Sequence, residues 1–355
     1  MATPPEPTIS ARLIAWHRQH GRHDLPWQQT RDPYRVWLSE IMLQQTQVAT
    51  VIPYYRRFLA RFPTLPDLAA APADEVMGLW SGLGYYARAR NLHRCAGIVM
   101  AAHGGEFPRD PDAIAALPGI GRSTANAIAV FCFGARRAIL DGNVKRVLCR
   151  AFGVDGFPGT PTVERELWSL AERLLPRRDA ATYIQAQMDL GATLCTRTQP
   201  ACLGAASSCP LSRTCVAYRQ GRVADLPQPR PRKSLPQREV RVLLVHQGNR
   251  VLLERRAPSG IWGGLLSLPE VPIEFDPLAF AAQALGLDVQ HLDALPALHH
   301  SFTHFRLTLL PLAGAAKRLP RAAEAASHSW LKREDIDAAG LPTPVRRILK
   351  GFFGA

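Results

Sequence analysis

Two carboxylates are the first residues in this sequence whose type and surroundings could do chemistry. Glu40 lies within residues 37–46, where helical spacing puts it beside an apolar face that contains Trp37 and Ile41. Asp141 precedes a glycine at an expected helix start, a place where Asp is commonly a capping or turn residue. A catalytic Asp141 needs a partner carboxylate, and Glu40 can supply one. The alternatives are that Asp141 only caps a helix and that Glu40 is only a solvent-exposed surface charge.

A glycine turn between two expected helices is the second feature. It reads Leu117-Pro-Gly-Ile-Gly121, and its two glycines let the backbone turn sharply and expose N–H groups at a helix N-terminus. Such a hairpin can hold a phosphate without reading base sequence. The same five residues also fit an ordinary connection between helices, so this motif alone leaves both interpretations open.

Four of the seven cysteines are grouped, at Cys195, Cys202, Cys209 and Cys215. Four thiolates within so short a stretch suit a zinc ion or an iron–sulfur cluster. Structural zinc usually has paired short spacings, and the wider gaps here favour a [4Fe–4S] cluster over zinc. The alternative is four buried thiols without a ligand. The total of seven is odd, and a reducing compartment argues against a disulfide framework.

The composition describes ordinary cores under a basic surface. Of 355 residues 47% are hydrophobic and 20% charged, so two domains can each bury a core. The net charge of +14 favours a polyanionic partner, nucleic acid before a membrane. No secretory signal is visible, and the longest apolar stretch, residues 127–135, is too short for a bilayer. We therefore expect a soluble, cytoplasmic protein that does not bind membranes.

The elements that must position these residues follow from hydrophobic spacing. Apolar residues recur about every 3.6 positions from residue 37 to residue 59, which predicts one helix or a kinked pair, with Pro53 as the kink. Asp110-Pro111 predicts the start of a short helix before the glycine turn, and another helix should begin after Gly121. The first part of the chain is therefore predicted to be helical.

The pattern changes after residue 218. Residues 219–241 are rich in Pro, Arg and Lys, which is typical of an extended basic linker. Beyond them the period becomes two, and residues 247–249 carry a hairpin signal between two strand-like runs. An α+β part is thus expected to follow the helical part, ending in a helix over residues 344–352.

Longer motifs make these features resemble a known family. The glycine turn, an Asp about twenty residues later and four cysteines behind them resemble the helix-hairpin-helix DNA glycosylases of the endonuclease III superfamily. Within it, the chain resembles the MutY family of adenine DNA glycosylases. The segments that carry this closer resemblance are residues 25–27, 36–53, 82–91 and 139–147.

The resemblance implies hydrolysis of the N-glycosidic bond of adenine mispaired with 8-oxoguanine or guanine in duplex DNA. It implies that Glu40 protonates N7 of adenine and that Asp141 stays ionised and stabilises the oxocarbenium-like sugar. A nearly apolar helix face would raise the pKa of Glu40, as an acid at neutral pH requires. The base must first be flipped out of the stack.

The resemblance also implies a set of contact residues. Gln45 and Tyr85 lie where the family wedges side chains into the duplex. Ser123 stands where lyase members carry a Schiff-base lysine, and a hydroxyl cannot form an imine, so a monofunctional glycosylase is expected. The remaining implied contacts with DNA are Gly119, Gly121, Ser123 and Lys145, and those with the flipped adenine are Trp27, Gln28, Leu43 and Gln185.

Two departures from the family pattern concern the cofactor and the lesion. The middle cysteine gap is usually two residues but is six here, through residues 203–208, and an outward bulge would leave the four ligands of a [4Fe–4S] cluster in place. The family's Phe-Ser-His is Phe302-Thr303-His304 here. Thr keeps a hydroxyl that can accept from N7–H and donate to O8 of 8-oxoguanine, so lesion recognition is still expected.

The second part resembles the Nudix fold, which raises two further alternatives. A Nudix hydrolase of oxidised nucleotides needs a helix with a carboxylate cluster for Mg²⁺, and residues 277–286 contain none. An endonuclease III-like pyrimidine-lesion glycosylase is a nearer alternative, against which the missing lysine and the extra domain argue. A non-catalytic iron–sulfur DNA scaffold would not need both Glu40 and Asp141.

The expected fold is therefore multidomain: an all-α helix-hairpin-helix glycosylase with an iron–sulfur module, followed by an α+β Nudix-like domain. Residues 1–29 and 138–218 would form the cluster module, and residues 30–137 a six-helix domain. A basic linker would span residues 219–237, and the Nudix-like domain residues 238–355. We expect a monomer.

Overall fold

The computed structural model describes residues 8–204, 208–231, 235–257, 260–302, 304–317 and 328–354. Contacts divide the chain into two compact units: unit 1 contains residues 1–55, 64–66 and 94–232, and unit 2 contains residues 56–63, 67–93 and 233–355. No helix in the described ranges is long and apolar enough to cross a membrane. The four-part division predicted from the sequence stays a prediction.

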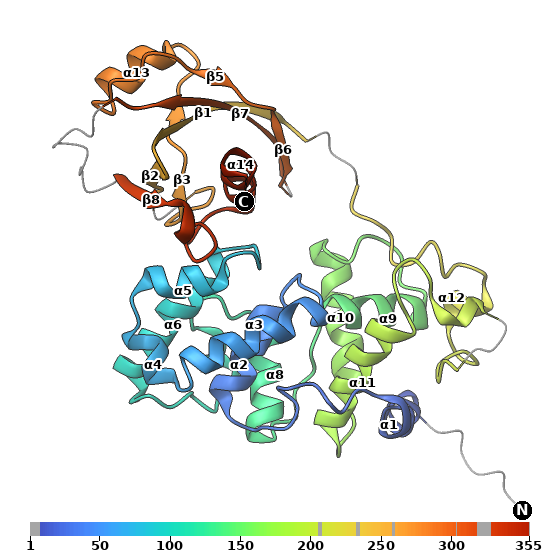
Figure 1. Cartoon of the computed structure of the whole chain (residues 1–355). Coiled ribbons are helices and arrows are strands. Elements are labelled where there is room, and N and C mark those ends of the chain that lie inside the picture. The colour runs from blue at the N-terminus through green and yellow to red at the C-terminus, as the bar shows by residue number, and fades with distance from the viewer. Residues whose placement is uncertain are drawn as a thin grey trace, which may run out of the picture. The chain divides into compact units, whose positions relative to one another are not determined.

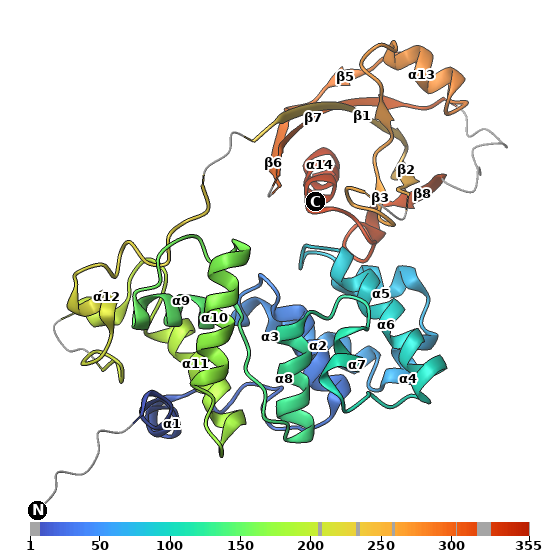
Figure 2. The same cartoon turned by 180° about the vertical axis from the view of Figure 1, so that it is seen from behind.

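Unit 1 is helical, as the sequence predicts. Its helix α1, near the N-terminus, lies beside α11 although the two are far apart in the chain (Figures 1 and 2). The helices are α1 (Ile9–His20), α2 (Pro33–Leu43), the first part of α3 (Val48–Arg61), the end of α6 (Ala87–His103), α7 (Pro111–Ala115), α8 (Arg122–Phe133), α9 (Gly142–Phe152), α10 (Pro161–Arg173), α11 (Ala180–Thr193), the 3₁₀ turn η1 (Ala201–Leu203) and α12 (Val216–Arg219).

Capping residues set the helix boundaries around the glycine turn. The side chain of Asp110 accepts a hydrogen bond from the N–H of Ala113, and Pro111 occupies the first position of α7. Gly119 has a φ of 79°, which a residue with a Cβ rarely adopts, and Gly121 caps α8. The predicted start of α7 and the helix–turn–helix connection are thus confirmed.

The break between α2 and α3 differs from the prediction. Pro53 lies inside α3, and the chain instead leaves the helix over residues 44–47. Gln45 adopts a φ of 57°, a left-handed conformation that cannot continue a helix. Hydrophobic spacing identifies the buried face of both helices, but it cannot reveal a single residue that leaves the helical region.

The core of unit 1 fixes the helices that surround the site. Leu13 of α1, Leu148 of α9, Leu167 of α10 and Leu190 of α11 are almost fully buried in one hydrophobic cluster. Because close-packed interiors resist displacement, this cluster fixes the position of the start of α9 relative to α11.

Unit 2 contains most of α4 (Leu65–Ala70), α5 (Ala73–Trp80) and an α+β part that confirms the second expectation. Its sheet has the strand order β3-β2-β1-β7-β5, in which β1 and β7 are parallel and the other pairs antiparallel. The strands are β1 (Gln237–Gln247), β2 (Arg250–Arg255), β3 (Leu266–Ser267), β4 (Glu270–Val271), β5 (Asp293–Ala294), β6 (Leu298–Ser301), β7 (Arg306–Ala315) and β8 (His328–Lys332).

Two helices cover the sheet of unit 2. Helices α13 (Pro277–Gln283) and α14 (Thr343–Phe353) lie on opposite sides of it (Figures 1 and 2). The predicted hairpin is confirmed, since Gln247 pairs with Arg250 across a two-residue turn, and α14 is the predicted final helix. Helix α13 carries no carboxylate, so it lacks the ligands with which a helix could hold Mg²⁺.

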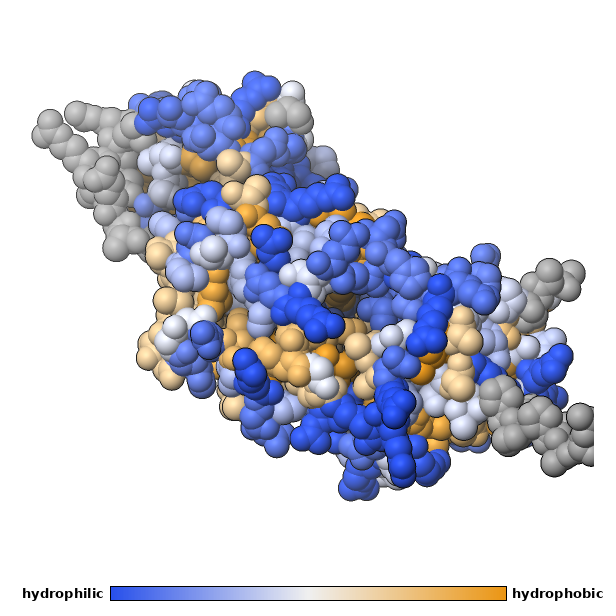
Figure 3. Space-filling view, turned by 90° about the horizontal axis from the view of Figure 1, so that it is seen from below, coloured by the Kyte–Doolittle hydropathy of each residue, from blue (hydrophilic) through white to orange (hydrophobic). Residues whose placement is uncertain are grey.

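One face of the surface is shown by hydropathy in Figure 3. On the face shown in Figure 3, hydrophilic residues predominate, and hydrophobic residues gather in patches between them. Such a face presents polar groups across most of its area rather than one continuous apolar surface.

Candidate active site

One open pocket in unit 1 brings together both predicted catalytic carboxylates and all four predicted adenine contacts. Its walls include the segment between α1 and α2, helices α2, α8 and α11, and the segment that leads into α9 together with the start of α9. Eight predicted residues line it: Trp27, Gln28, Glu40, Leu43, Gln45, Ser123, Asp141 and Gln185. The two carboxylates, which are far apart in the sequence, therefore face the same space.

Glu40 lies one turn before the end of α2 and holds its proton unusually tightly. Burial, aided by the negative charge of Asp141, raises the pKa of Glu40 to about 8. No hydrogen bond reaches its carboxyl group from any residue that the structure describes. A carboxyl in this environment is mostly neutral at pH 7 and can donate a proton.

Asp141 is the N-cap of α9 and is surrounded by donors. Its Oδ1 accepts from the N–H of Val144 at 2.7 Å, and its Oδ2 accepts from Nδ2 of Asn143 at 3.3 Å. Burial raises the pKa of Asp141, while these hydrogen bonds and the charge of Arg146 act to lower it. Burial prevails, so the pKa of Asp141 lies above its ordinary value. The donors around Asp141 nevertheless favour its ionised form, and no such donors reach Glu40 from the described residues, so Glu40 is the better proton donor of the two.

Asn143 and Arg146 connect Asp141 to the cysteine region. The guanidinium of Arg146 donates to Oδ1 of Asn143 and, through Nε, to the backbone carbonyl of Cys195, both at 2.7 Å. It also donates to the carbonyl of Gly191, and a Cβ at Gly191 would lie only 2.6 Å from Cβ of Asn143. Glycine is therefore required at this close crossing of α9 and α11.

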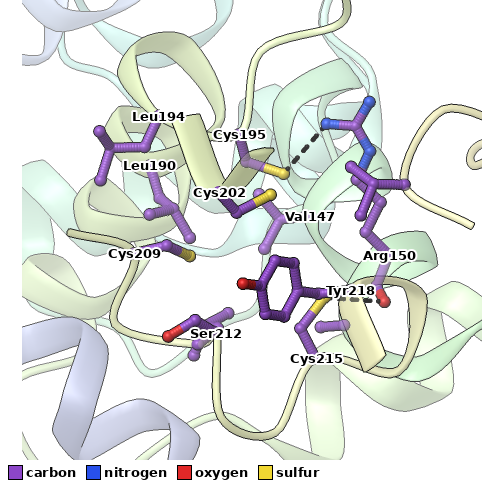
Figure 4. Close-up of a pocket in the computed structure, with 13 residues that line it drawn as sticks. Val147, Arg150, Leu190, Leu194, Cys195, Cys202, Cys209, Ser212, Cys215 and Tyr218 are labelled. Atoms are coloured by element: carbon purple, nitrogen blue, oxygen red, sulfur yellow. Dashed lines mark hydrogen bonds between the residues drawn. The ribbon is translucent and has the colours of Figure 1, made fainter. Parts of the chain in front are cut away.

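The four grouped cysteines converge on a second pocket of unit 1. Figure 4 shows Cys195, Cys202, Cys209 and Cys215 turned toward one space, which Val147, Leu190, Leu194 and Tyr218 help to close. Nη1 of Arg150 lies 3.4 Å from Sγ of Cys195, and Sγ of Cys215 donates to the carbonyl of Arg150 at 3.2 Å.

The cysteine pocket has the donor chemistry of a thiolate-bound group. Among the described residues, no three His, Cys, Asp or Glu side chains form a site for a single metal ion. The widened middle gap includes residues 205–207, which lie outside the described residues. Four soft sulfur donors in an apolar pocket beside a buried guanidinium nevertheless fit a thiolate-ligated cluster.

The glycine turn lies near the active pocket through Ser123. The hydroxyl of Ser123 accepts a hydrogen bond from the backbone N–H of Leu140 at 3.0 Å, one residue before Asp141. Ser123 thus ties the first turn of α8 to the strand-like segment that leads into α9. Gly119 and Gly121 form the turn itself and do not line the pocket.

Other predicted contact residues lie outside the pocket. Lys145 points from α9 to Glu164 of α10, with Nζ 2.7 Å from Oε1. Tyr85, in unit 2, is 48% exposed and has a φ of 49°. Of the predicted lesion-reading residues, Phe302 stacks on Phe305 with ring centroids 4.5 Å apart, His304 lies beside the same ring, and Thr303 lies outside the described residues.

Sequence reasoning missed one group that is hydrogen-bonded to residues lining the pocket but does not line it itself. Asp189 of α11 is fully buried and forms an ion pair with Arg22, which follows α1. Its only sequence signal is its position four residues after Gln185, which places both on one face of α11. The partner Arg22 is distant in the chain, so no local pattern reveals the pair.

Comparison with known proteins agrees with the two-part fold. Residues 38–173 match the HhH-GPD superfamily of base excision DNA repair proteins, and residues 240–351 match the NUDIX domain. The adenine DNA glycosylase of Buchnera aphidicola subsp. Acyrthosiphon pisum is 34% identical over 97% of both chains. The adenine DNA glycosylase of Homo sapiens is 33% identical and covers 96% of this chain and 73% of its own.

Solved structures give the same result for the helical part. A thermostable thymine-DNA glycosylase has a TM-score of 0.54 at 30% identity, covering 59% of this chain and 95% of its own. Endonuclease III, trapped in a covalent intermediate with DNA, shares the fold with a TM-score of 0.51 at 22% identity, covering 60% and 94%. From the near full-length relatives together with the two matched domains, this chain belongs to the adenine DNA glycosylase family.

Proposed function

We propose that this chain hydrolyses the N-glycosidic bond of adenine mispaired with 8-oxoguanine or guanine in duplex DNA. One observation carries the proposal: a buried carboxyl whose pKa is raised to about 8 and a second carboxyl that accepts hydrogen bonds from α9 face the same pocket. Adenine is a poor leaving group until a ring nitrogen is protonated, and the sugar develops positive charge as the bond breaks. In this pocket Glu40 would supply the proton and Asp141 the negative charge.

The residues act in sequence on a flipped adenosine. Glu40 donates its proton to N7, the bonding electron pair leaves with adenine, and Asp141 stabilises the cationic sugar. Water then adds to C1′ and loses a proton, which restores Glu40. Ser123 offers no amine for an imine, and its hydroxyl is engaged with Leu140, so the reaction ends at the abasic site without strand cleavage.

Binding to DNA divides among several parts of the chain. The net charge of +14 supports phosphate contacts, for which the glycine turn at Gly119 and Gly121 and the ammonium of Lys145 are the candidates. Gln45 and Tyr85 would enter the duplex, and both have a left-handed backbone and lie outside the helices. Phe302, Thr303 and His304 would read the lesion, with the Thr303 hydroxyl sensing N7–H and O8.

The cysteine pocket would hold a [4Fe–4S] cluster through Cys195, Cys202, Cys209 and Cys215. When bound, such a cluster would link the segments that carry the four cysteines through its iron–sulfur bonds. Arg150, which is buried beside Cys195, would compensate negative charge on the sulfurs. We further propose a monomeric protein in the cytoplasm.

A glycosylase assay tests the proposal directly. Duplexes containing adenine opposite 8-oxoguanine, guanine, cytosine or thymine are incubated with excess protein, and abasic sites are cleaved by alkali. We expect release opposite 8-oxoguanine and guanine and little opposite thymine. Failure to release adenine from any duplex would remove the proposed function, whereas release of oxidised pyrimidines instead would support the endonuclease III-like alternative.

A further inference from the structure

Arg22 and Asp189 form a buried ion pair next to residues that line the pocket. Asp189 accepts from the guanidinium of Arg22 through Oδ1, at 2.6 and 2.9 Å, and from the backbone N–H of Arg22 through Oδ2 at 2.8 Å. His17 Nε2 lies 3.2 Å from Oδ2. Burial would raise the pKa of Asp189, but His17 and Arg22 outweigh it and hold that pKa below its ordinary value. Asp189 is therefore an ionised group that can only accept hydrogen bonds.

A third partner of this carboxylate is Gln185, which lines the active pocket. The side-chain amide of Gln185 lies 3.0 Å from Oδ1 of Asp189. An amide can present either its NH₂ group or its carbonyl oxygen, but only the NH₂ group can donate to a carboxylate. Asp189 therefore fixes which way the amide points. The carbonyl oxygen of Gln185 is left with no hydrogen bond from the described part of the chain, at the wall of the pocket.

We propose that the Arg22–Asp189 pair orients Gln185 so that its carbonyl oxygen accepts the 6-amino group of adenine and thereby disfavours 6-oxopurines. The proposal rests on the function proposed above. Adenine carries N7 and the 6-amino group side by side on one edge, so the base that receives a proton at N7 from Glu40 presents its amino group nearby. Hypoxanthine carries a carbonyl oxygen there, and it would face the oxygen of Gln185 without a proton between them.

The test compares three bases that differ at position 6. Duplexes carry adenine, purine (hydrogen at position 6) or hypoxanthine opposite guanine, and single-turnover excision rates are measured for wild type and variants. The three bases differ in how readily they leave, whatever the protein does. For each protein we therefore divide the adenine rate by the hypoxanthine rate and by the purine rate, and we then divide each ratio of a variant by the same ratio of wild type. Intrinsic reactivity cancels in this quotient.

Asp189→Asn keeps the shape but lets position 189 donate as well as accept, so the amide of Gln185 is free to turn. We expect the adenine-to-hypoxanthine ratio to fall by about threefold to tenfold and the adenine-to-purine ratio by a smaller factor. Asp179→Asn is the matched control: Asp179 also joins α11 to α1 through Arg18, at 3.3 Å, but both side chains are exposed and neither lines the pocket. It should leave both ratios unchanged.

A second variant keeps the proposal falsifiable if Asp189→Asn does not fold, as judged by circular dichroism. Gln185→Met removes the amide but leaves the Arg22–Asp189 pair intact, and it should lower the same two ratios. Equal loss of rate for all three bases in both variants would mean that the residues only support the pocket, and unchanged ratios would also overturn the inference. Both results differ from failure of the proposed function, in which wild type releases no adenine.

Discussion

The excision rate at alkaline pH should report the proton on Glu40. Burial, aided by the charge of Asp141, raises the pKa of Glu40 to about 8. A carboxyl with this pKa is about nine-tenths protonated at pH 7 and about one-tenth protonated at pH 9. If Glu40 is the general acid, the single-turnover rate of adenine excision should fall about tenfold between these two pH values.

Glu40→Gln keeps the size of the side chain and removes the proton that it donates. The rate should fall by about 10²- to 10⁴-fold, and the residual rate should be flat from pH 7 to pH 9. Binding to the intact duplex should persist, because phosphate contacts supply most of the affinity. Glu106→Gln, which changes an exposed carboxylate, is the control and should keep the rate and its pH dependence.

The raised pKa of Glu40 also predicts how the stability of the folded protein changes with pH. Since the folded-state pKa of about 8 exceeds the ordinary value of 4.5, the stabilising contribution is complete below pH 4.5 and is lost as pH rises through 8. A shift of about 3.5 units corresponds to at most about 4–5 kcal/mol. Glu40→Gln should therefore raise Tm at pH 8.5 and have little effect at pH 5.

Two results of the rate measurements would refute Glu40 as the acid: a wild-type excision rate that rises from pH 7 to pH 9, or the same alkaline decline of the rate in Glu40→Gln.

Three further predictions address the other parts of the site. Asp141→Asn should abolish single-turnover excision while duplex binding measured by gel shift persists, because it removes the charge that faces the sugar cation; near-normal cleavage would contradict this role. Anaerobically purified protein should contain about four irons per chain and absorb visible light, and Cys202→Ser should lower the iron content; one zinc per chain would exclude the cluster. Thr303→Val should reduce the preference for 8-oxoguanine over guanine by about fivefold to hundredfold, and an unchanged ratio of rates would show that Thr303 does not read the lesion.

The sequence predicts best those features that local chemistry encodes. The caps and turn around α7 and α8 follow from Asp110, Pro111 and the two glycines, and the structure has the helices where these residues place them. The two-residue turn between β1 and β2 is equally local. In each case the residues that specify the geometry are neighbours in the chain, so one short window contains the whole signal.

What the sequence does not reveal depends on contacts between distant segments. Arg22 and Asp189 meet only because α1 packs beside α11, and neither residue carries a local mark of its partner. The requirement for glycine at Gly191 arises in the same way, from the close approach of Asn143. The break after α2 depends on the left-handed backbone of Gln45, which hydrophobic spacing does not record.

The different surroundings of the two carboxyls follow from where each lies relative to its helix. Glu40 lies near the end of α2, beyond the reach of the unpaired N–H groups at a helix N-terminus, so burial dominates and the proton stays. Asp141 lies at the start of α9, where unpaired N–H groups and the helix dipole favour negative charge. One fold thus gives two chemically similar groups different surroundings: burial and the charge of Asp141 act on Glu40 and favour its proton, whereas hydrogen-bond donors at Asp141 oppose the effect of burial. Moving either carboxyl by one helical turn would remove this difference while leaving the composition of the pocket unchanged.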